Sequence, residues 1–457
     1  MNPAPFLPFA GQRFAVVGLG RAGLPSARRL VEWGAEILCW DDGEAARAAA
    51  TAAGLPVGDP SARAGFPFDA LLLSPGIPHI LPRVHPAAAA AKAAGVPVVC
   101  DAELLYRAVR AAGSRARFAG ITGTNGKSTT TALVHHLLRR AGRDAEVGGN
   151  LGPAALGLPL LGDAGIYVLE MSSYMLERLV TLRFDIGVVL NLSPDHLDRH
   201  GGMDGYAGAK LHIFDRQHEG DLAVLGMDDA WGAHFAAGRA ARVMPVSGQA
   251  RQPGGIWAEG RLLRDDAGII ADLDTARALP GSHNAQNAAA ATAVVLALGV
   301  PRDAIAAGLA DFPGLPHRQE TVGTLDGIAF VNDSKATNAD STARALASYG
   351  RVVLIAGGVP KAGGLEPLAQ YFPRIAHAVL IGQSAPDFAA TLAAHGVPHH
   401  VAGTLEAALP AALAAARDSG TGIVLLSPAC ASFDQFSGFD ARGDAFRAQV
   451  ASMMETV

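Results

Sequence analysis

Short apolar runs recur along the chain, each followed by a polar or glycine-rich cluster and then by a longer segment with helical spacing. This alternation is typical of parallel β-sheets covered by helices, because strands buried on both faces read as continuous apolar runs. The fold class expected is therefore α/β. The runs that predict strands are residues 13–17, 36–40, 70–73, 96–99, 117–121, 166–170, 186–190, 328–331, 352–356, 378–381 and 423–426.

Two breaks in the alternation divide the chain into three predicted domains. Residues 111–117 are small, polar and basic, and Pro313-Gly314-Leu315-Pro316 would end a helix and stiffen a linker. A length of 457 residues also suggests about three domains. Residues 243–279 are rich in Gly, Pro and charge and predict irregular or antiparallel strands. The predicted domains are a Rossmann-like N-terminal domain (1–112), a central P-loop ATPase-like parallel sheet (113–314) and a Rossmann-like C-terminal domain (315–457).

The most informative stretch is the glycine-rich sequence 120–130, which lies between a predicted strand and a predicted helix at 131–140. The N–H groups of such a turn and the helix N-terminus bind phosphate, while Lys127 and the Ser128 hydroxyl can reach a nucleotide phosphate and its Mg²⁺. A strict phosphate-loop pattern would need glycine at Ile121, so this loop is tighter. It predicts an ATP site made of Gly123, Thr124, Asn125, Gly126, Lys127, Ser128 and Thr129.

A second glycine-rich loop, residues 18–23, follows the first predicted strand, and Asp41 ends the second. Glycines in this setting allow close approach to a diphosphate, and an acid about 20 residues further on takes a ribose hydroxyl. The turn at residues 74–78 lies at the same carboxyl edge of the predicted sheet. The loop predicts a dinucleotide-type site, and an NAD-dependent oxidoreductase is one alternative that it supports.

Polar clusters follow other predicted strands. Glu170 is suited to Mg²⁺, although a helix N-cap is the alternative. Residues 191–200 hold two His, two Asp and one Arg, which favours metal or phosphate binding. Residues 332–338 offer Lys335 and hydroxyl groups to phosphate or carboxylate. Residues 427–436 follow the last predicted strand, again at the functional edge, and a capped turn is the alternative for both segments. Lys210 lies in a helical pattern and by itself is typical of a solvated surface lysine.

Composition narrows the classes of function. A net charge of −5 argues against a general nucleic-acid binder. Cys39, Cys100 and Cys430 lack metal-ligand spacing and are expected to be buried thiols in a reducing compartment. No apolar run reaches the length of a membrane span, and residues 1–10 lack a basic n-region. We expect a cytoplasmic monomer without membrane insertion.

Taken in order, these motifs resemble the Mur ligases, and the resemblance covers nearly the whole chain. The N-terminal dinucleotide-like domain and residues 427–436 narrow it to members that add D-glutamate to UDP-N-acetylmuramoyl-L-alanine in peptidoglycan precursor synthesis. It implies that ATP, with Mg²⁺, phosphorylates the substrate carboxylate and that the amine attacks the acyl phosphate. Folylpolyglutamate synthases share the central part, and a P-loop protein that uses ATP as a switch is a further alternative. The motifs are residues 122–129, 169–173, 195–198, 281–284, 316–318 and 332–338.

The resemblance also implies roles for individual residues by motif position. The catalytic residues implied are Lys127, His196 and Lys210, with Lys210 as the family's carbamylated lysine. The Mg²⁺ ligands implied are Ser128, Glu170, His196 and Lys210, and the further nucleotide contacts are Asn287, Arg318 and Asp333. The UDP-substrate contacts implied are Gly20, Arg21, Asp41, Gly76, Asn150 and His196. The D-glutamate contacts implied are Lys335, Thr337, Lys361, Ser432 and Phe439.

Overall fold

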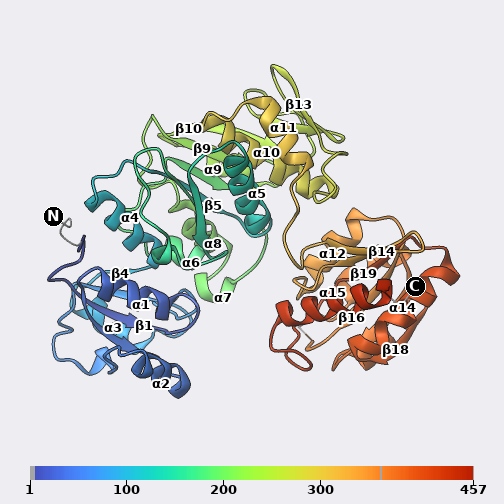
Figure 1. Ribbon diagram of the computed structural model, residues 1–457, viewed down its shortest axis with the longest axis horizontal. Coiled ribbons are helices and arrows are strands. Elements are labelled where there is room, and N and C mark those ends of the chain that lie inside the picture. Colours follow the sequence, from blue (N-terminus) through green and yellow to red (C-terminus); the bar gives the residue numbers. More distant parts are fainter. Residues whose placement is uncertain (1–5, 361–362, 456–457) are drawn as a thin grey trace. The chain divides into compact units, whose positions relative to one another are not determined.

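The computed structural model describes residues 6–360 and 363–455. Within them the chain forms three β-sheets with helices between the strands, which confirms the predicted α/β class (Figure 1). Chain contacts divide it into two compact units. The first unit comprises residues 1–275 and 285–311, and the second comprises residues 276–284 and 312–457.

The first unit begins with a parallel sheet of order β2-β1-β3-β4. Its strands are β1 (Arg13–Val17), β2 (Glu36–Trp40), β3 (Ala70–Leu73) and β4 (Val98–Val99). The helices around it are α1 (Gly23–Glu32), α2 (Glu44–Ala52), η1 (Pro60–Ala62) and α3 (Pro86–Ala93), and α4 (Asp101–Ala111) leads to the next sheet. One hydrophobic core contains Phe14 of β1, Leu104 of α4 and Phe118 of the next sheet, so the two sheets share buried residues.

The second sheet has the order β13-β12-β11-β10-β9-β8-β5-β7-β6. Its pairs are parallel from β6 to β11, and β11, β12 and β13 form an antiparallel meander, as residues 243–279 predict. The strands are β5 (Arg117–Thr122), β6 (Ala145–Gly149), β7 (Ile166–Glu170), β8 (Ile186–Val189), β9 (Leu222–Gly226), β10 (Arg242–Ser247), β11 (Ile256–Glu259), β12 (Leu262–Asp265) and β13 (Gly268–Asp272). The helices are α5 (Lys127–Arg140), η2 (Ala155–Gly157), α6 (Ser173–Leu176), α7 (Leu197–His200), α8 (Met203–Leu211), α9 (Trp231–Ala236), α10 (Gly281–Ala297) and α11 (Arg302–Ala310).

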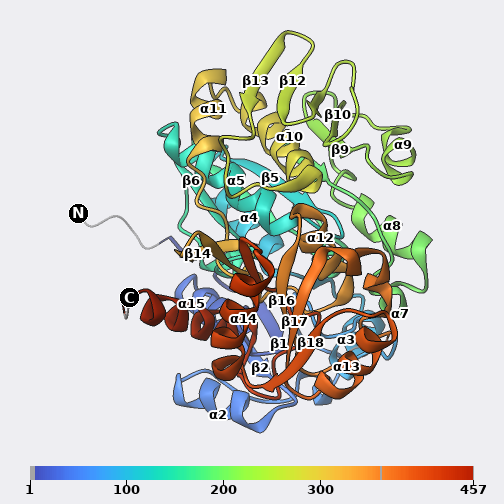
Figure 2. The same cartoon turned by 90° about the vertical axis from the view of Figure 1, so that its right-hand side faces the viewer.

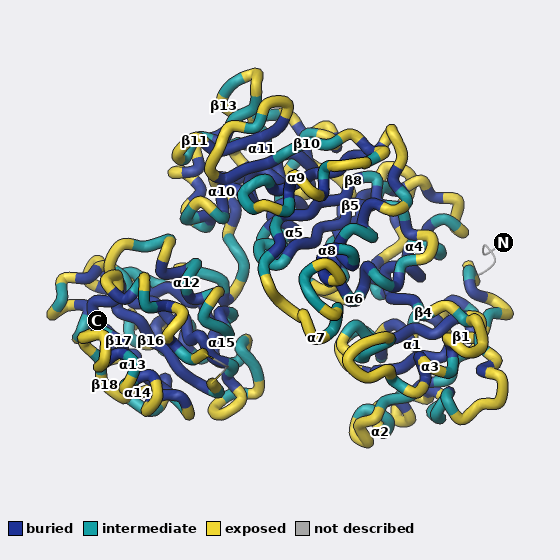
Figure 3. The backbone as a smooth tube through the Cα atoms, turned by 180° about the vertical axis from the view of Figure 1, so that it is seen from behind, coloured by how far each residue is buried: buried dark blue, intermediate teal, exposed yellow. Residues whose placement is uncertain are grey.

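The central strands β5 and β8 are buried, because helices cover both faces of a parallel sheet (Figure 3). Close packing also fixes Gly120 within β5, since an added Cβ atom would lie 2.6 Å from the ring of Phe184. The sheet therefore holds the loops at its carboxyl edge on a rigid base, and that edge carries the glycine-rich stretch.

The second unit contains a sheet of order β14-β15-β19-β16-β17-β18, parallel except for the pair β14 and β15. Its strands are β14 (Glu320–Leu325), β15 (Ile328–Asn332), β16 (Val352–Gly357), β17 (Ile375–Ile381), β18 (His399–Gly403) and β19 (Ile423–Leu426). Two hydrophobic cores flank it, one with α14 (Leu405–Ser419) and α15 (Phe439–Glu455), the other with α12 (Ala339–Ser348), η3 (Glu366–Arg374) and α13 (Ala385–Ala394) (Figure 2).

The structure differs from the sequence predictions in local ways. Helix α5 begins at Lys127, not at residue 131, so Lys127 and Ser128 form its first turn. The N–H groups of a first helical turn have no intrahelical acceptor, and the first turn is the part that can bind a phosphate. Each predicted domain contains one sheet, and its exact boundaries stay predictions. All three cysteines are buried, as expected. Among the described residues, we find no helix with the length and apolar character of a membrane span.

Candidate nucleotide and substrate site

The glycine-rich loop connects β5 to α5 at the carboxyl edge of the second sheet. Gly126 occupies the N-cap position with φ +81°, a left-handed conformation that favours glycine. A Cβ atom there would lie 2.2 Å from Oδ1 of Asn287 in α10, so Gly126 also permits the close approach of that side chain. The structure thus places Asn287, a predicted nucleotide contact, directly against the predicted phosphate loop.

Asn191 and Thr124 hold the loop in shape. The Asn125 N–H donates to Asn191 Oδ1 at 2.9 Å, and Asn191 Nδ2 donates to the Asn125 carbonyl at 3.1 Å. Thr124 Oγ1 accepts from the Ser193 N–H at 3.0 Å. The segment after β8 therefore holds the loop in place by hydrogen bonds. The number of polar residues in that segment did not by itself predict this role.

The Lys127 side chain folds back over the loop. Its Nζ donates to the carbonyl oxygens of Gly123 at 3.0 Å and Thr124 at 2.8 Å. This places a positive charge at the mouth of a helix N-terminus, where a phosphate anion is favoured. The arrangement has the chemistry of a nucleotide phosphate site.

Glu170 ends β7 next to the loop and is 1% exposed. Its Oε1 accepts from Asn150 Nδ2 at 2.6 Å, whereas its Oε2 is buried without a hydrogen-bond partner in the described residues. A buried carboxylate oxygen with no partner is unfavourable unless a cation reaches it. Glu170 does not act as a helix N-cap, because Ser172 caps α6 by accepting from the Met175 N–H.

Lys210 is buried, contrary to the expectation of a solvated lysine from its local pattern. It is 1% exposed, and its Nζ donates to the Gly123 carbonyl at 2.8 Å and to Thr122 Oγ1 at 3.4 Å. Burial lowers the pKa of Lys210 well below its usual value, and the charge of Lys127 lowers it further. The local pattern failed here because α8 turns this side chain toward the loop and not toward solvent.

His196 lies on a separate segment beside these groups. It has a left-handed backbone, with φ 52°, and a half-exposed side chain 3.4 Å from Asp195. Its ring lies 5.1 Å from that of Tyr174. Burial lowers the pKa of His196, the charge of Asp195 acts in the opposite direction, and the charges of Lys127 and Lys210 lower it further.

The cluster 191–200 does not by itself form a set of metal ligands. No group of three or more His, Cys, Asp or Glu that could hold a metal occurs in residues 6–360 and 363–455. His200 Nε2 lies 2.9 Å from Ser173 Oγ and its Nδ1 lies 3.0 Å from Glu177 Oε1, so this histidine fastens α7 to α6. Metal or phosphate binding by other members of the cluster stays a prediction.

A cavity of about 560 Å³ opens between the first glycine-rich loop and the second sheet. Four predicted UDP-substrate residues, Gly20, Arg21, Asp41 and Asn150, line it, whereas Gly76 and His196 are not among its lining residues. Sequence reasoning did not assign Asp101, Ala154 or Met175, which also line it. No local motif marks these three, because they reach the cavity from separate elements.

The first glycine-rich loop is built tightly against neighbouring groups. Asp41 accepts from the N–H of Leu19 at 2.6 Å and from that of Gly43 at 2.8 Å, so its carboxylate shapes the loop. Gly18 has φ +89°, and a Cβ atom there would lie 2.6 Å from that of Ser74. The glycine is therefore required by both conformation and space.

In the second unit, Asp333 follows β15 and is buried. Ser427 Oγ donates to its Oδ2 at 2.7 Å, and the Gln319 N–H donates to its Oδ1 at 3.3 Å. Burial raises the pKa of Asp333 to about 7, although the hydrogen bonds and the charge of Arg318 act in the opposite direction. The charge of Arg318 therefore acts on this carboxyl group, and the role of both residues as nucleotide contacts stays a prediction.

The predicted acceptor residues also gather at the carboxyl edge of the second unit's sheet. Lys335 Nζ lies 3.8 Å from the centre of the Phe439 ring, a cation–π contact. Arg442 donates from Nη2 to the carbonyl oxygens of Ser334 and Cys430, which ties the loop with Lys335 and Thr337 to the loop with Ser432. Lys361 lies outside the described residues.

Comparison with known proteins shows which family the chain belongs to. Residues 121–295 match the Mur ligase middle domain, and residues 317–430 match the Mur ligase glutamate ligase domain. A UDP-N-acetylmuramoylalanine--D-glutamate ligase of Caulobacter sp. (strain K31) is 50% identical over 453 residues, covering 97% of this chain and 96% of that protein. The ligase of the same name from Phenylobacterium zucineum (strain HLK1) is 48% identical, covering 98% and 97%. The chain therefore belongs to the Mur ligase family.

Solved structures show the same fold at lower identity. The UDP-N-acetylmuramate-alanine ligase of Thermotoga maritima aligns with a TM-score of 0.58 at 19% identity, covering 97% of this chain and 99% of that one. The UDP-N-acetylmuramoylalanyl-D-glutamyl-2,6-diaminopimelate--D-alanyl-D-alanyl ligase of Acinetobacter baumannii aligns with a TM-score of 0.58 at 19% identity, covering 97% and 91%. These similarities establish the architecture, and the two relatives at 50% and 48% identity establish the family.

Proposed function

We propose that this protein is an ATP-dependent ligase that adds D-glutamate to UDP-N-acetylmuramoyl-L-alanine through an acyl phosphate, in peptidoglycan precursor synthesis. A carboxylate is a poor electrophile, and phosphorylation gives it a leaving group that the amine of D-glutamate displaces. Relatives at 48–50% identity over nearly the whole chain carry the corresponding name. The NAD-dependent and regulatory alternatives leave the Mur ligase domains unexplained, and the folate alternative lacks this full-length match.

The observation that carries the proposal is the hydrogen bond between Asn150 and Glu170. Asn150 lines the cavity beside the first glycine-rich loop, and Glu170 ends the strand next to the phosphate loop. A UDP-linked substrate whose diphosphate occupies the cavity would thus have its carboxylate end near the nucleotide phosphate. Proximity of the two reacting groups is the main requirement for phosphoryl transfer.

The residues present fit a magnesium ion. The unpartnered Oε2 of Glu170 is a hard oxygen donor, and Ser128 lies in the first turn of α5. Mg²⁺ is bound in many nucleotide sites by one or two protein oxygens together with phosphates and water, so a protein-only cage is not required. Bound there, the ion would neutralise developing phosphate charge. Lys127 would orient the same phosphate and stabilise its charge.

The decisive test is ADP release with UDP-N-acetylmuramoyl-L-alanine and a panel of amino acids. We expect release that requires the UDP substrate and D-glutamate together. ADP release that depends on a folate, or that does not respond to any amino acid, would refute the proposal.

We expect Lys210 to be carbamylated in the active protein. Its lowered pKa increases the neutral amine that can take up CO₂, and the carbamate would replace a buried positive charge near Glu170 with a carboxylate-like ligand. With ¹³C-labelled bicarbonate, NMR should show a carbamate carbon signal that Lys210→Ala lacks and that Lys335→Ala retains. A signal of equal strength in wild type and Lys210→Ala would contradict this.

We also expect strong preference for D-glutamate over L-glutamate and L-alanine. Lys335, Thr337 and Ser432 offer a cation and hydroxyl groups that can seat two carboxylates, and the opposite chirality would then aim the amine away from the acyl phosphate. Loss of one charge-assisted hydrogen bond costs about 1.5–3 kcal/mol, so the ratio of kcat/KM values should lie between about 10-fold and over 100-fold. The measurement is product formation by chromatography for each amino acid.

The matched variant for this prediction is Lys335→Met, which keeps the length of the side chain and removes its charge. It should raise the KM for D-glutamate while leaving the KM for ATP within about twofold. Equal rates with both glutamate enantiomers in the wild type would show that the acceptor site has been misread.

A further inference from the structure

Arg178 is a buried arginine in the first unit. It follows helix α6, which comes after strand β7 of the second sheet. It is 1% exposed. Its guanidinium donates to the carbonyl oxygens of Leu73 at 2.6 Å, Ser74 at 3.0 Å and Ile77 at 2.6 Å. These carbonyls belong to the end of β3 and to the turn that follows it. A side chain from a segment after β7 of the second sheet therefore holds a turn of the first sheet by hydrogen bonds.

The gripped turn forms a wall of the cavity. The Ile77 N–H donates to the Ser74 carbonyl at 3.0 Å, which closes a four-residue turn with Pro75 and Gly76 at its centre. Ser74, Pro75 and Ile77 line the cavity. Within the described part of the chain, the Gly76 N–H donates to no protein acceptor. Arg178 holds the carbonyl oxygens of Ser74 and Ile77, and Arg199 Nη1 donates to the carbonyl of Gly76 at 3.0 Å, so two arginines hold the carbonyl oxygens of the turn.

Arg178 remains charged despite its burial. Burial lowers its pKa to about 10, which is still well above neutral pH. The neighbouring carboxylate, Glu177, lies instead against His200 at 3.0 Å and His79 at 3.9 Å. Nε of Arg178 is buried without a partner in the residues that the structure describes. Besides the three carbonyl oxygens, Nη2 of Arg178 lies 3.5 Å from Nδ1 of His79, whose pKa burial lowers to about 4. A buried cation with neutral partners is unfavourable, and an anion in the adjacent cavity would offset part of that cost.

The position of Arg178 in the sequence links it to the phosphate loop. Glu170 ends β7, Met175 of α6 lines the cavity, and Arg178 follows two residues after α6. Residues 170–178 therefore include the carboxylate next to the phosphate loop, a residue that lines the cavity and the arginine that bonds to the turn. Shifting the turn relative to this segment would shift a bound substrate relative to the phosphate loop.

We propose that Arg178 is a positioning residue that holds the Ser74–Ile77 turn in the form that binds the diphosphate of the UDP-linked substrate, and so sets the reach of its carboxylate toward the phosphate loop. The inference rests on the proposed function and adds to it a residue that no local motif marks. The proposal predicts that loss of Arg178 weakens binding of the UDP substrate and leaves the KM for ATP nearly unchanged.

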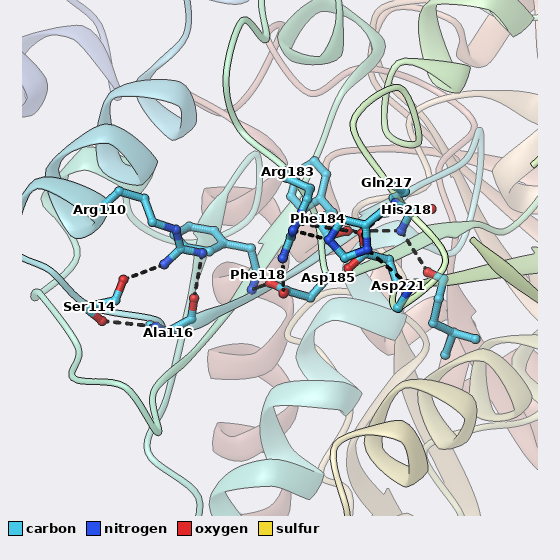
Figure 4. Close-up of polar contacts among 12 residues, drawn as sticks. Arg110, Ser114, Ala116, Phe118, Arg183, Phe184, Asp185, Gln217, His218 and Asp221 are labelled. Carbon is cyan, nitrogen blue, oxygen red and sulfur yellow. Dashed lines mark hydrogen bonds and ion pairs between the residues drawn. The ribbon is translucent and has the colours of Figure 1, made fainter. Parts of the chain in front are cut away.

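The test compares Arg178→Met with the wild type. The variant should weaken UDP binding, measured by calorimetry, by about 10-fold or more and raise the KM for UDP-N-acetylmuramoyl-L-alanine similarly, while the KM for ATP stays within about twofold. Arg178→Lys keeps the charge but not the planar fork and should recover part of the affinity. The control is Arg110→Met, because Arg110 donates in the same way to the carbonyls of Ser114 at 2.8 Å and Ala116 at 3.0 Å, outside the cavity lining (Figure 4).

Unchanged UDP affinity in a folded Arg178→Met would overturn the inference. An equal rise in both KM values would also overturn it, since that is the result of a general structural role. If Arg178→Met does not fold, Arg178→Lys is judged by the same difference between the two KM values. Failure of the wild-type protein to bind UDP would refute the substrate assignment, whereas equal binding by wild type and variant refutes only the role of Arg178.

Discussion

Replacing Lys127 by alanine should abolish turnover while the protein stays folded. Its ammonium group lies at the mouth of the α5 N-terminus, where it would stabilise the charge that develops on the transferred phosphate. Removing such a group costs about 3 kcal/mol or more of transition-state stabilisation, which lowers kcat by at least about 100-fold. The fold should persist, because the two hydrogen bonds from Lys127 Nζ to the carbonyl oxygens of Gly123 and Thr124 lie within a loop that Asn191 and Thr124 also hold in shape.

The measurement is steady-state ADP release, with far-UV circular dichroism and thermal unfolding to establish the fold. Lys92→Ala is the control, because Lys92 is exposed on helix α3, which packs beside the first sheet. Near-normal turnover in folded Lys127→Ala would remove the basis for the ATP site.

Replacing Glu170 by glutamine should lower turnover by at least about 100-fold and raise the Mg²⁺ concentration needed for half-maximal rate. The amide keeps the shape of the side chain and can still accept the hydrogen bond from Asn150, so the change removes mainly the charge. Because Oε2 has no hydrogen-bond partner in the described residues, the neutral side chain should not destabilise the fold.

Initial rates over a range of Mg²⁺ concentrations, together with thermal unfolding, would measure both effects. Glu146→Gln is the control, because Glu146 lies on the neighbouring strand β6, paired with Tyr167 and away from the carboxyl edge. A Glu170→Gln variant with the wild-type dependence on Mg²⁺ would exclude Glu170 as a metal ligand.

The sequence determined the elements and the chemistry that depend on neighbouring residues. Strands such as β1, β2 and β7 were predicted with their observed bounds, because a continuous apolar run bounded by polar residues is a local property. The glycine-rich loop is predicted for the same reason, since phosphate binding by such a loop depends on consecutive backbone N–H groups. The helix start at Lys127 was missed by four residues, because the first turn carries the Gly-Lys-Ser-Thr chemistry and lacks apolar spacing.

Only the tertiary structure decided which distant side chains meet. Lys210 is typical of a surface lysine by its own pattern, yet packing against Thr122 and Gly123 buries it and changes its pKa. Asn150 bonds to Glu170 across 20 residues, and Arg178 reaches Ser74 across 104. These contacts depend on sheet order and on the approach of two sheets. The physical reason is that burial and long-range hydrogen bonding belong to the packed chain as a whole, whereas periodicity and turn chemistry are contained in a few consecutive residues.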